Sequence, residues 1–169
     1  MKLKQKILLI ALLPLLVLGV AITIVSNREI NMAMNETIQD GLRGTAISMR
    51  STFRQLNSEP YRVNENGELV KGDFNISQYT DMADEIKETA NIDISVIYGD
   101  TRYMTSLKDS SGQRITGTKT DAATVEAVEG RGEELFVDDA EVDGMVYYGY
   151  YIPLLDLSTG EGVGMVFAG

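Results

Sequence analysis

Hydrophobic and polar positions divide the chain into an apolar run, a helical stripe and a series of alternating segments. Residues 7–25 contain no charged side chain and consist mainly of leucine, isoleucine, valine and alanine. As a helix they would span roughly 28 Å, close to the hydrocarbon thickness of a bilayer. Residues 1–6 are rich in lysine and acidic residues predominate after the run. The positive-inside rule therefore places the basic flank in the cytoplasm and the rest outside.

A cleaved signal peptide has the same layout, with a basic start followed by a leucine-rich segment. The apolar run is longer than the core of a typical signal peptide, and no Ala-x-Ala cleavage site follows it. Pro14 lies inside the run, where a membrane helix tolerates it. We therefore predict an uncleaved transmembrane helix in the cell membrane, with the C-terminal domain extracytoplasmic.

Apolar residues after Ser26 recur every three or four positions, which is the spacing of an amphipathic helix. The stripe consists of Ile30, Met34, Ile38, Leu42, Ala46, Met49, Phe53 and Leu56. We predict a long helix over residues 26–59 that continues out of the membrane and ends at Pro60. Gly41 and Gly44 each weaken it by about 1 kcal/mol relative to alanine, so packing in a core or a dimer must hold it.

Residues 60–169 alternate in the manner of strands, and we predict one sheet domain. Residues 61–76 carry turn-forming residues and predict a loop, after which Ser77 is expected to cap a helix that extends to about Thr89. A short helix is expected from Thr120 or Asp121 through Val128. Five strands are expected, over residues 92–98, 102–107, 134–142, 145–154 and 163–168.

The connections between these strands predict the topology. The dipeptides Gly99-Asp100 and Asp143-Gly144 are typical of tight hairpin turns. Hairpins join strands one to two, three to four and four to five, and a helix-bearing crossover separates two from three. With the fifth strand beside the first, the order is 2-1-5-4-3. This is a PAS-like α+β fold, one antiparallel sheet with the long helix on one face and a concave pocket on the other.

Composition and charge narrow the function. The 169 residues include no cysteine and no histidine, which removes thiolate and imidazole metal ligands and the usual general base. We expect no metal, no cofactor and no enzymatic activity. Adjacent acids such as Asp138 and Asp139 point to opposite faces of a strand and are interpreted as solvated. The net charge of −10 excludes nucleic acid as a partner.

Four ordered motifs lie in the second half of the chain: DISVIYGDTRYMTS at 93–106, GxRIxGT at 112–118, YYGYYIPL at 147–154 and GMVFAG at 164–169. Together they resemble the extracellular single Cache sensor domain of bacterial methyl-accepting chemotaxis proteins. The resemblance covers nearly the whole chain, including the anchor. It implies a homodimer along the long helix that binds a small molecule in the pocket of the sheet and signals across the membrane.

Such receptors continue into a second membrane helix, a HAMP domain and a methylated coiled coil. We expect these downstream modules to lie outside this chain. Sensor histidine kinases and cyclic-dinucleotide enzymes carry similar sensors, and both remain alternatives. A pilin-like structural protein also joins an apolar helix to a sheet, but it should carry a glutamate inside the apolar run and a glycine before it. Here the apolar run contains no glutamate, and no glycine precedes it.

The resemblance also implies where a ligand binds. In related carboxylate-sensing Cache domains an arginine opens the second strand, a histidine follows three residues later, and basic residues stand four and two positions before the proline of strand four. Arg102 matches the arginine, whereas Thr105 replaces the histidine. Gly149 and Tyr151 replace the basic residues. A small polar or carboxylate-bearing ligand, such as an organic acid or an amino acid, fits this set better than a di- or tricarboxylate.

Strand alternation assigns the tyrosines to two faces. Tyr147 and Tyr151 should share the face that Gly149 opens, whereas Tyr148 and Tyr150 should point at the long helix. Each tyrosine is either a ligand contact or part of the sheet core with its hydroxyl satisfied.

Arg102 has two interpretations as well. It either binds an anion or pairs with Asp100 or Asp93, because a buried unpaired charge costs several kcal/mol. The residues predicted to bind the ligand are Arg102, Thr105, Tyr147, Tyr151, Tyr103 and Tyr98.

Overall fold

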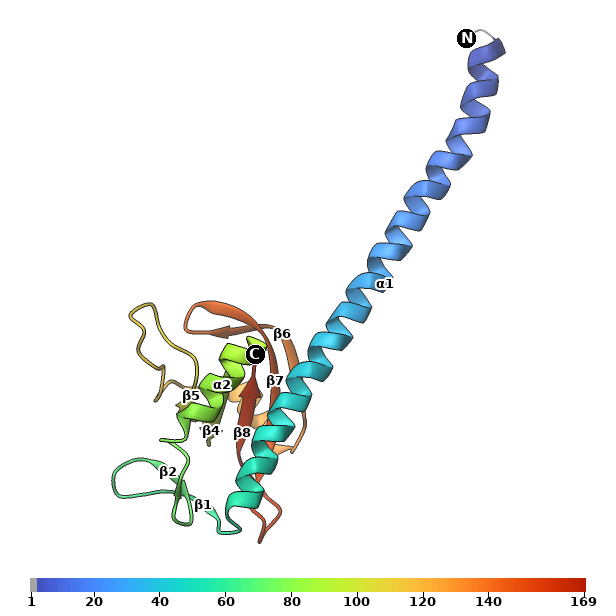
Figure 1. Cartoon of the computed structure of the whole chain (residues 1–169). Helices are drawn as coiled ribbons and strands as arrows, with labels where there is room; N and C mark the ends of the chain where they lie inside the picture. The colour runs from blue at the N-terminus through green and yellow to red at the C-terminus, as the bar shows by residue number, and fades with distance from the viewer. Residues whose placement is uncertain (1–2) are drawn as a thin grey trace. The chain divides into compact units, whose positions relative to one another are not determined.

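The computed structural model describes the backbone of residues 3–169, and two compact units divide between Ile38 and Gln39. The long helix α1, Leu3–Leu56, supplies the whole described part of the first unit and enters the second (Figure 1). The side chains of residues 1–11, 27 and 31 lie outside the described residues, and so does much of the predicted basic flank.

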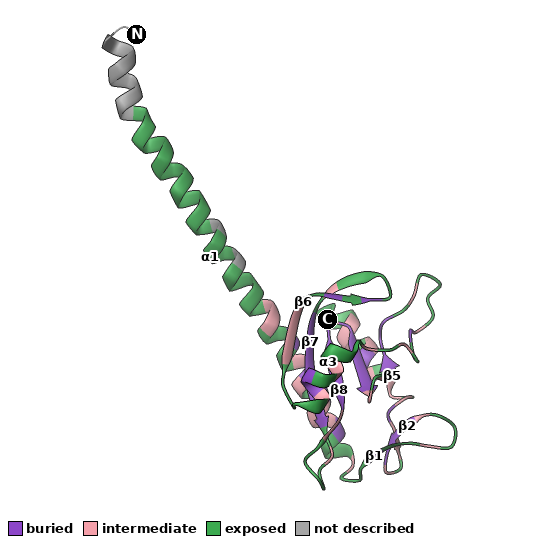
Figure 2. Ribbon diagram, turned by 180° about the vertical axis from the view of Figure 1, so that it is seen from behind, coloured by how far each residue is buried: buried purple, intermediate pink, exposed green. Residues whose placement is uncertain are grey.

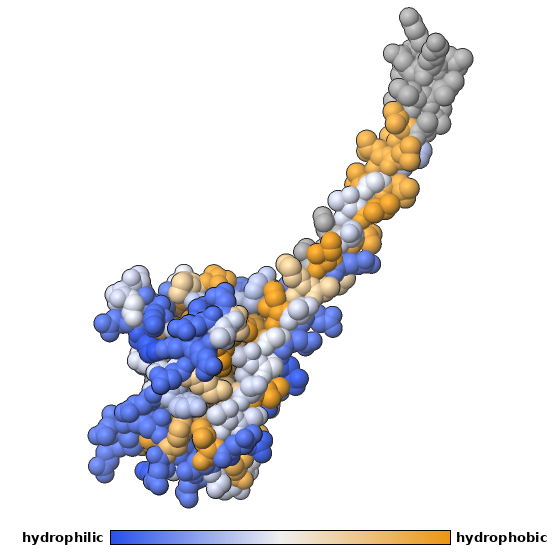
Figure 3. Space-filling model, in the orientation of Figure 1, coloured by the Kyte–Doolittle hydropathy of each residue, from blue (hydrophilic) through white to orange (hydrophobic). Residues whose placement is uncertain are grey.

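In the first unit, α1 is apolar and exposed. The large hydrophobic side chains from Leu12 to Val25 are each more than half exposed. Figure 3 shows the apolar surface along the described part of the helix. Within the described residues, one helix is long and apolar enough to cross a membrane, and it is α1. The predicted membrane segment is therefore helical, and its described side chains, from Leu12 to Val25, are exposed.

In the second unit, the predicted stripe of α1 becomes core. Leu42, Ala46, Met49 and Phe53 are buried, whereas Leu56 at the end of the helix is exposed. Arg50 donates from Nη1 to the carbonyl oxygen of Pro153 at 3.2 Å and so ties the helix to the sheet. In this unit α1 therefore buries its apolar face in the core, as amphipathic helices of globular domains do.

The main sheet has five antiparallel strands in the order β5-β4-β8-β7-β6 (Figures 1 and 2). The strands are β4 Ile94–Tyr98, β5 Thr101–Thr105, β6 Leu135–Val142, β7 Met145–Leu155 and β8 Gly162–Ala168. In chain order this is 2-1-5-4-3, the order that the hairpin pattern predicts. The predicted α+β fold, with a Cache-like or PAS-like sheet and a long N-terminal helix, is confirmed.

The hairpin turns use the backbone conformations that their residues favour. Gly99 has a φ of 56°, and the pair Asp143 and Gly144 has φ of 51° and 75°. Two consecutive left-handed residues match the twist of the flanking strands, which is why Asp-Gly is a frequent hairpin turn. Gly164 has a different role, because a side chain there would collide with the carbonyl oxygen of Ile97 on the neighbouring strand.

Residues 61–76 are not a loop, and that prediction was wrong. They form a small antiparallel sheet of β1 Tyr61–Val63, β2 Leu69–Lys71 and β3 Phe74–Asn75. Each strand has only two or three residues, too few for alternation to stand out among the asparagines and glycines of the intervening turns. Burial of Leu69 and Ile76 holds this sheet against the domain.

The helix after this small sheet also begins later than predicted. Helix α2 is Thr80–Ala90, and its N-cap is Tyr79 without a capping side chain. Ser77 is not the cap, because its Oγ instead accepts a hydrogen bond from the backbone N–H of Leu69 at 2.8 Å. A serine oxygen can satisfy any nearby backbone donor, so the cap motif alone did not fix the start.

The second face of the main sheet is covered by α3 Ala122–Val125 and the π-helical turn η1 Glu126–Gly130. Asp121 caps α3 by accepting from the backbone N–H of Thr124 at 2.8 Å, as predicted. A core lies between this cover and the sheet and consists of Ile97, Leu107, Ile115, Ala127, Val128, Val142, Tyr151, Met165 and Phe167.

Candidate ligand-binding site

Arg102 and Thr105 lie on the same face of the sheet, although they are three residues apart. A bulge in the pairing of β4 with β5 explains this: Arg102 lies opposite Ile97, whereas Thr105 lies opposite Ser95. Ser95 and Ile97 are two residues apart and so share a face. Phe167 lies opposite both Ser95 and Tyr151 on this face. The sheet therefore gathers residues from four strands around Arg102.

The Arg102 side chain is buried and makes neutral contacts. The residue is 3% exposed. Its Nε donates to Ser95 Oγ at 3.0 Å and its Nη1 donates to Thr118 Oγ1 at 2.9 Å. The guanidinium carbon lies 5.9 Å from the centre of the Phe167 ring. Within the part of the chain that the structure describes, no carboxylate oxygen lies within 4 Å of this guanidinium.

The two acids considered as partners of Arg102 are committed elsewhere. Asp100 accepts from Lys119 at 2.6 Å, and Asp93 pairs with Lys87 at 2.7 Å. A structural pair between Arg102 and either acid is therefore wrong. Burial lowers the pKa of Arg102, while nearby tyrosines act in the opposite direction. A guanidinium stays charged in proteins, so the domain holds a buried positive charge without a negative counterpart.

A cavity of about 310 Å³ opens beside Arg102. Thr118 and Tyr151 line it together with the arginine, and the β6–β7 hairpin contributes Glu141, Val142 and Asp143. Burial raises the pKa of Tyr151 to about 12, so its phenol remains protonated at neutral pH and can donate a hydrogen bond. The cavity thus offers the unpaired Arg102, the ion-paired Lys119 and hydroxyl donors, with the acids Asp121, Glu141 and Asp143 also in its lining.

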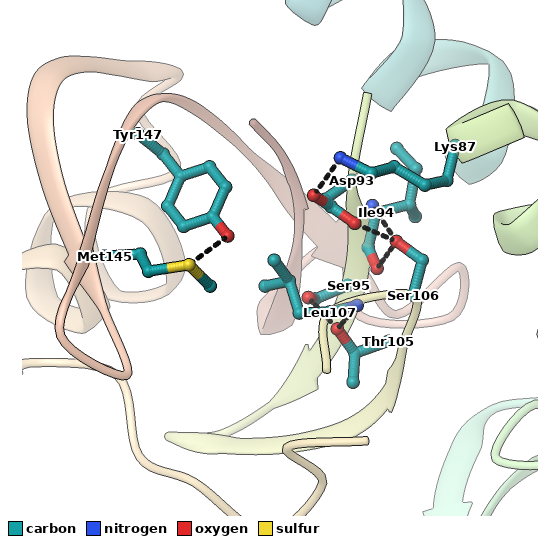
Figure 4. Close-up of polar contacts among 9 residues, drawn as sticks. All are labelled: Lys87, Asp93, Ile94, Ser95, Thr105, Ser106, Leu107, Met145 and Tyr147. Carbon is teal, nitrogen blue, oxygen red and sulfur yellow. Dashed lines mark hydrogen bonds and ion pairs between the residues drawn. The ribbon is translucent and has the colours of Figure 1, made fainter. Parts of the chain in front are cut away.

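A second cavity, of about 470 Å³, lies where the same hairpin faces the end of α2. Figure 4 shows Tyr147 and Met145 on one side of the opening and Lys87, Asp93 and Ser106 on the other. The Tyr147 hydroxyl contacts only the sulfur of Met145, at 3.8 Å, among the described residues. Since a thioether is a weak acceptor, this hydroxyl can bond to a ligand at little cost.

Tyr147 and Tyr151 lie on one face, as their alternation predicts. Their rings lie 6.3 and 5.0 Å from the ring of Phe167. Gly149 stands between them, and an added Cβ would come within 2.9 Å of Phe167. The glycine therefore allows Phe167, Tyr151 and Ala140 to pack closely around this position.

Comparison with known families now adds to this geometry. Residues 74–169, from β3 to the last residue, match the family described as single Cache domain 3. This chain belongs to the single Cache domain 3 family. Cache domains are extracellular sensor modules that bind small molecules, and they are generally non-catalytic. A comparison with curated proteins found no significant match.

The structure does not bring all the predicted residues of this Cache domain together. Thr105 lies on the site face, but its hydroxyl already bonds to Ser95 at 2.7 Å and accepts from the backbone of Leu107 at 3.0 Å. Tyr98 and Tyr103 pack against each other at 6.4 Å, and Tyr98 donates toward the Tyr61 carbonyl at 3.4 Å. None of these three residues lines either cavity.

The other two tyrosines of β7 lie on the opposite face. Tyr150 donates to Glu134 at 3.0 Å, and Glu134 accepts from Arg43 of α1, so this tyrosine faces the helix as predicted. Tyr148 is exposed and stacks on Phe136 with parallel rings 6.2 Å apart.

Two residues that line the cavities, Thr118 and Asp93, are not among the predicted ligand contacts. Thr118 ends the GxRIxGT motif, but only the fold shows that its hydroxyl meets Arg102. Asp93 was considered only as a partner of Arg102, whereas it forms a buried network with Lys87 and Ser106 at 2.7 and 2.8 Å. Among the residues that the structure describes, no group of three or more acidic side chains is placed to hold a metal ion.

Proposed function

We propose that this chain is the extracytoplasmic sensor part of a transmembrane chemoreceptor and that it binds a small carboxylate-bearing ligand at Arg102. The observation that carries the proposal is the buried guanidinium without an acidic partner. Neutral hydroxyls offset only part of the cost of removing a charge from water. A ligand carboxylate would supply the missing charge through a bidentate, charge-assisted pair.

The two cavities set the size and character of the ligand in this proposal. Volumes of about 310 and 470 Å³ suit organic acids, amino acids and molecules of similar size. Tyr151 and Thr118 would orient the carboxylate at Arg102, and Tyr147 would contact the remainder of a ligand that reaches the second cavity. Thr105 would act indirectly, by holding Ser95 against the arginine.

The anchor and the output complete the proposal. Residues 7–25 cross the membrane, residues 26–59 continue as the long helix of a homodimer, and residues 60–169 sense the ligand. No enzymatic activity is assigned to the chain. The chemoreceptor role is supported by the ordered motifs that resemble such receptors, and sensor kinases and cyclic-dinucleotide enzymes differ from it in their cytoplasmic modules.

A thermal-shift screen tests the ligand-binding function. The full chain in detergent micelles is heated with single organic acids, amino acids, purines and amines. A ligand at a hundred times its Kd should stabilise the folded state by about 2.7 kcal/mol, a rise in Tm of several degrees. The variant Arg102→Met keeps an unbranched stem that reaches about as far as Nε and removes the charged guanidinium. Arg131→Met is the matched control, because Arg131 is exposed and pairs only with Glu133.

The expected result is a rise in Tm for the original chain and the Arg131 variant, and no rise for the Arg102 variant. A hit that survives Arg102→Met would place the ligand elsewhere. A folded chain that responds to no compound in a broad panel would argue for a domain that senses a protein partner instead.

A further inference from the structure

A second group of cations lies at the C-terminal end of α1, away from both ligand cavities. Arg50 and Arg54 from the helix and Lys71 from β2 form what we call the cation cluster. A hollow of about 220 Å³ opens beside it, lined by the two arginines and by Tyr61 and Asp156 among others. This hollow shares no lining residue with either cavity of the candidate ligand site.

Lys71 is the buried member of the cation cluster. The residue is 1% exposed, and its Nζ donates to the backbone carbonyl of Glu59 at 2.5 Å. The same Nζ lies 4.2 Å from the centre of the Tyr61 ring. Burial lowers the pKa of Lys71, and the neighbouring Arg54 lowers it further, whereas Asp156 and Glu59 raise it. An ammonium has three donors, and one carbonyl and one ring face leave its charge without an anion in contact.

The two arginines are also without acidic partners. Within the described residues, neither Arg50 nor Arg54 has a carboxylate oxygen within 4 Å. They are four residues apart on a helix and therefore neighbours on one face, where like charges repel. Both line the hollow together with Tyr61. The chain is acidic as a whole, so the three cations near Tyr61 form a local region of positive charge.

Three structural roles account for only part of this charge. Arg50 donates from Nη1 to the neutral carbonyl of Pro153, which leaves the charge of its guanidinium uncompensated. Arg54 lies in the last turn of α1, where a cation complements the negative end of the helix dipole, but that end carries only about half an elementary charge. Asp156 supplies one negative charge, but its Oδ1 already accepts from the backbone and hydroxyl of Ser158. A positive excess therefore remains beside the hollow.

We propose that the cation cluster is a second binding site, which takes a phosphate or sulfate group. A guanidinium forms paired hydrogen bonds with oxyanions, and two guanidiniums on one helix face can engage one tetrahedral group. The Tyr61 hydroxyl supplies a further donor. A group with up to two negative charges matches three cations better than a single carboxylate does. The group can be a free ion or a monoester on a larger molecule, and both share this chemistry.

Titration calorimetry on the full chain in detergent micelles tests the second site. The probes are inorganic phosphate, inorganic sulfate and glucose 6-phosphate, each compared with sodium chloride at equal ionic strength. The variants are Arg50→Gln and Arg54→Gln. The matched control is Arg62→Gln, because Arg62 is an exposed arginine on β1 without an ion pair among the described residues. Arg102→Met separates this site from the ligand cavity.

Phosphate or sulfate should bind, and each cluster variant should weaken binding about tenfold, because a hydrogen bond to a charged group contributes on that order. Arg62→Gln and Arg102→Met should leave the affinity unchanged. Asp156→Asn should tighten binding, since the amide keeps the turn acceptor and removes a repelling charge; loss of folding cannot imitate this gain. Tighter binding of the ester than of both free ions would support a site for a larger molecule, and equal binding a free-ion site.

The proposal would be overturned if phosphate and sulfate gave no more heat of binding than sodium chloride at equal ionic strength. An equal loss of affinity in Arg62→Gln would overturn it too, because it would show attraction to positive charge in general.

Discussion

Arg102 lies at a position where a charged side chain with only a structural role would lower the stability of the fold. Its charge is buried on the face of the sheet, its two side-chain partners are neutral hydroxyls, and a cavity begins beside it. A methionine would fill the space of the arginine's stem without the cost of desolvating a charge. We therefore interpret Arg102 as a ligand-binding residue whose buried charge lowers the stability of the ligand-free domain.

Arg102→Met should leave the ligand-free protein as stable as the original or make it more stable by about 1 kcal/mol. The relief of desolvation should offset the loss of the hydrogen bonds to Ser95 and Thr118. Urea unfolding followed by circular dichroism measures this difference. A loss of more than about 2 kcal/mol would mean that the arginine holds the sheet together, and the argument for a missing anion would fail.

Three of the residues predicted to bind the ligand line a cavity in the structure, and the hydroxyl of Thr118 beside Arg102 was not predicted. Arg102, Tyr147 and Tyr151 follow from motif and alternation, because strand period fixes which side chains share a face. Thr118 could not be placed, since it lies in an irregular segment whose path depends on tertiary contacts. Tyr98 and Tyr103 are also predicted to contact the ligand, yet their rings pack against each other and line neither cavity.

A polar link joins α1 to the edge of the main sheet. Arg43 of the helix donates to Glu134 at 2.6 Å, and Tyr150 of β7 donates to the same carboxylate at 3.0 Å. The hydrogen bond from Arg43 is the main reason that the pKa of Glu134 is lowered below its ordinary value of 4.5. Tyr147 and Tyr151 also belong to β7. A single strand therefore joins the face of the sheet that carries these two tyrosines to the contact with α1.

Glu134→Gln should cost about 1 kcal/mol of stability at pH 7, because the pair is partly exposed and solvent screens it. A carboxyl whose pKa falls on folding stabilises the protein fully above pH 4.5, and the contribution disappears as the pH falls through the lower folded pKa. The original chain and the variant should therefore converge in acid. Asp138→Asn, at an exposed position of β6, the strand that follows Glu134, is the control. A difference between original and variant that persists at pH 2 would show that the carboxylate charge is not the cause.

The elements that the sequence predicted well are those with strong periodicity. Each of them has a sequence pattern that one kind of local structure explains. They are the helical stripe, the two hairpin turns and the ten-residue apolar strand, and together they predict the order of the five strands. The small sheet of β1, β2 and β3 was missed because strands of two or three residues depend on burial of side chains such as Leu69, which local pattern does not reveal.

The apolar stripe of α1 continues beyond the residues that the domain buries. Ile30 and Met34, four residues apart, are 59% and 54% exposed. Exposed apolar side chains at helical spacing form a seam that a second helix can cover. We propose that two copies of the chain associate along this seam.

Ile30→Glu with Met34→Glu should weaken the dimer at least a hundredfold, because two carboxylates per chain would have to be buried against each other. Met32→Glu is the matched control, since Met32 is equally exposed but lies outside the stripe. Sedimentation equilibrium in detergent measures the dissociation constant. Equal weakening by the control, or none by the double variant, would place the dimer contact elsewhere.

Calorimetric titration of the compound that gives the largest thermal shift decides whether Arg102 is the ligand anchor. The titration is carried out on the original chain, on Arg102→Met and on Arg131→Met. Loss of a buried ion pair should weaken binding at least a hundredfold in the Arg102 variant, about 2.7 kcal/mol, and leave the Arg131 control unchanged. An affinity within threefold of the original in Arg102→Met would contradict the proposal and move the ligand away from this arginine.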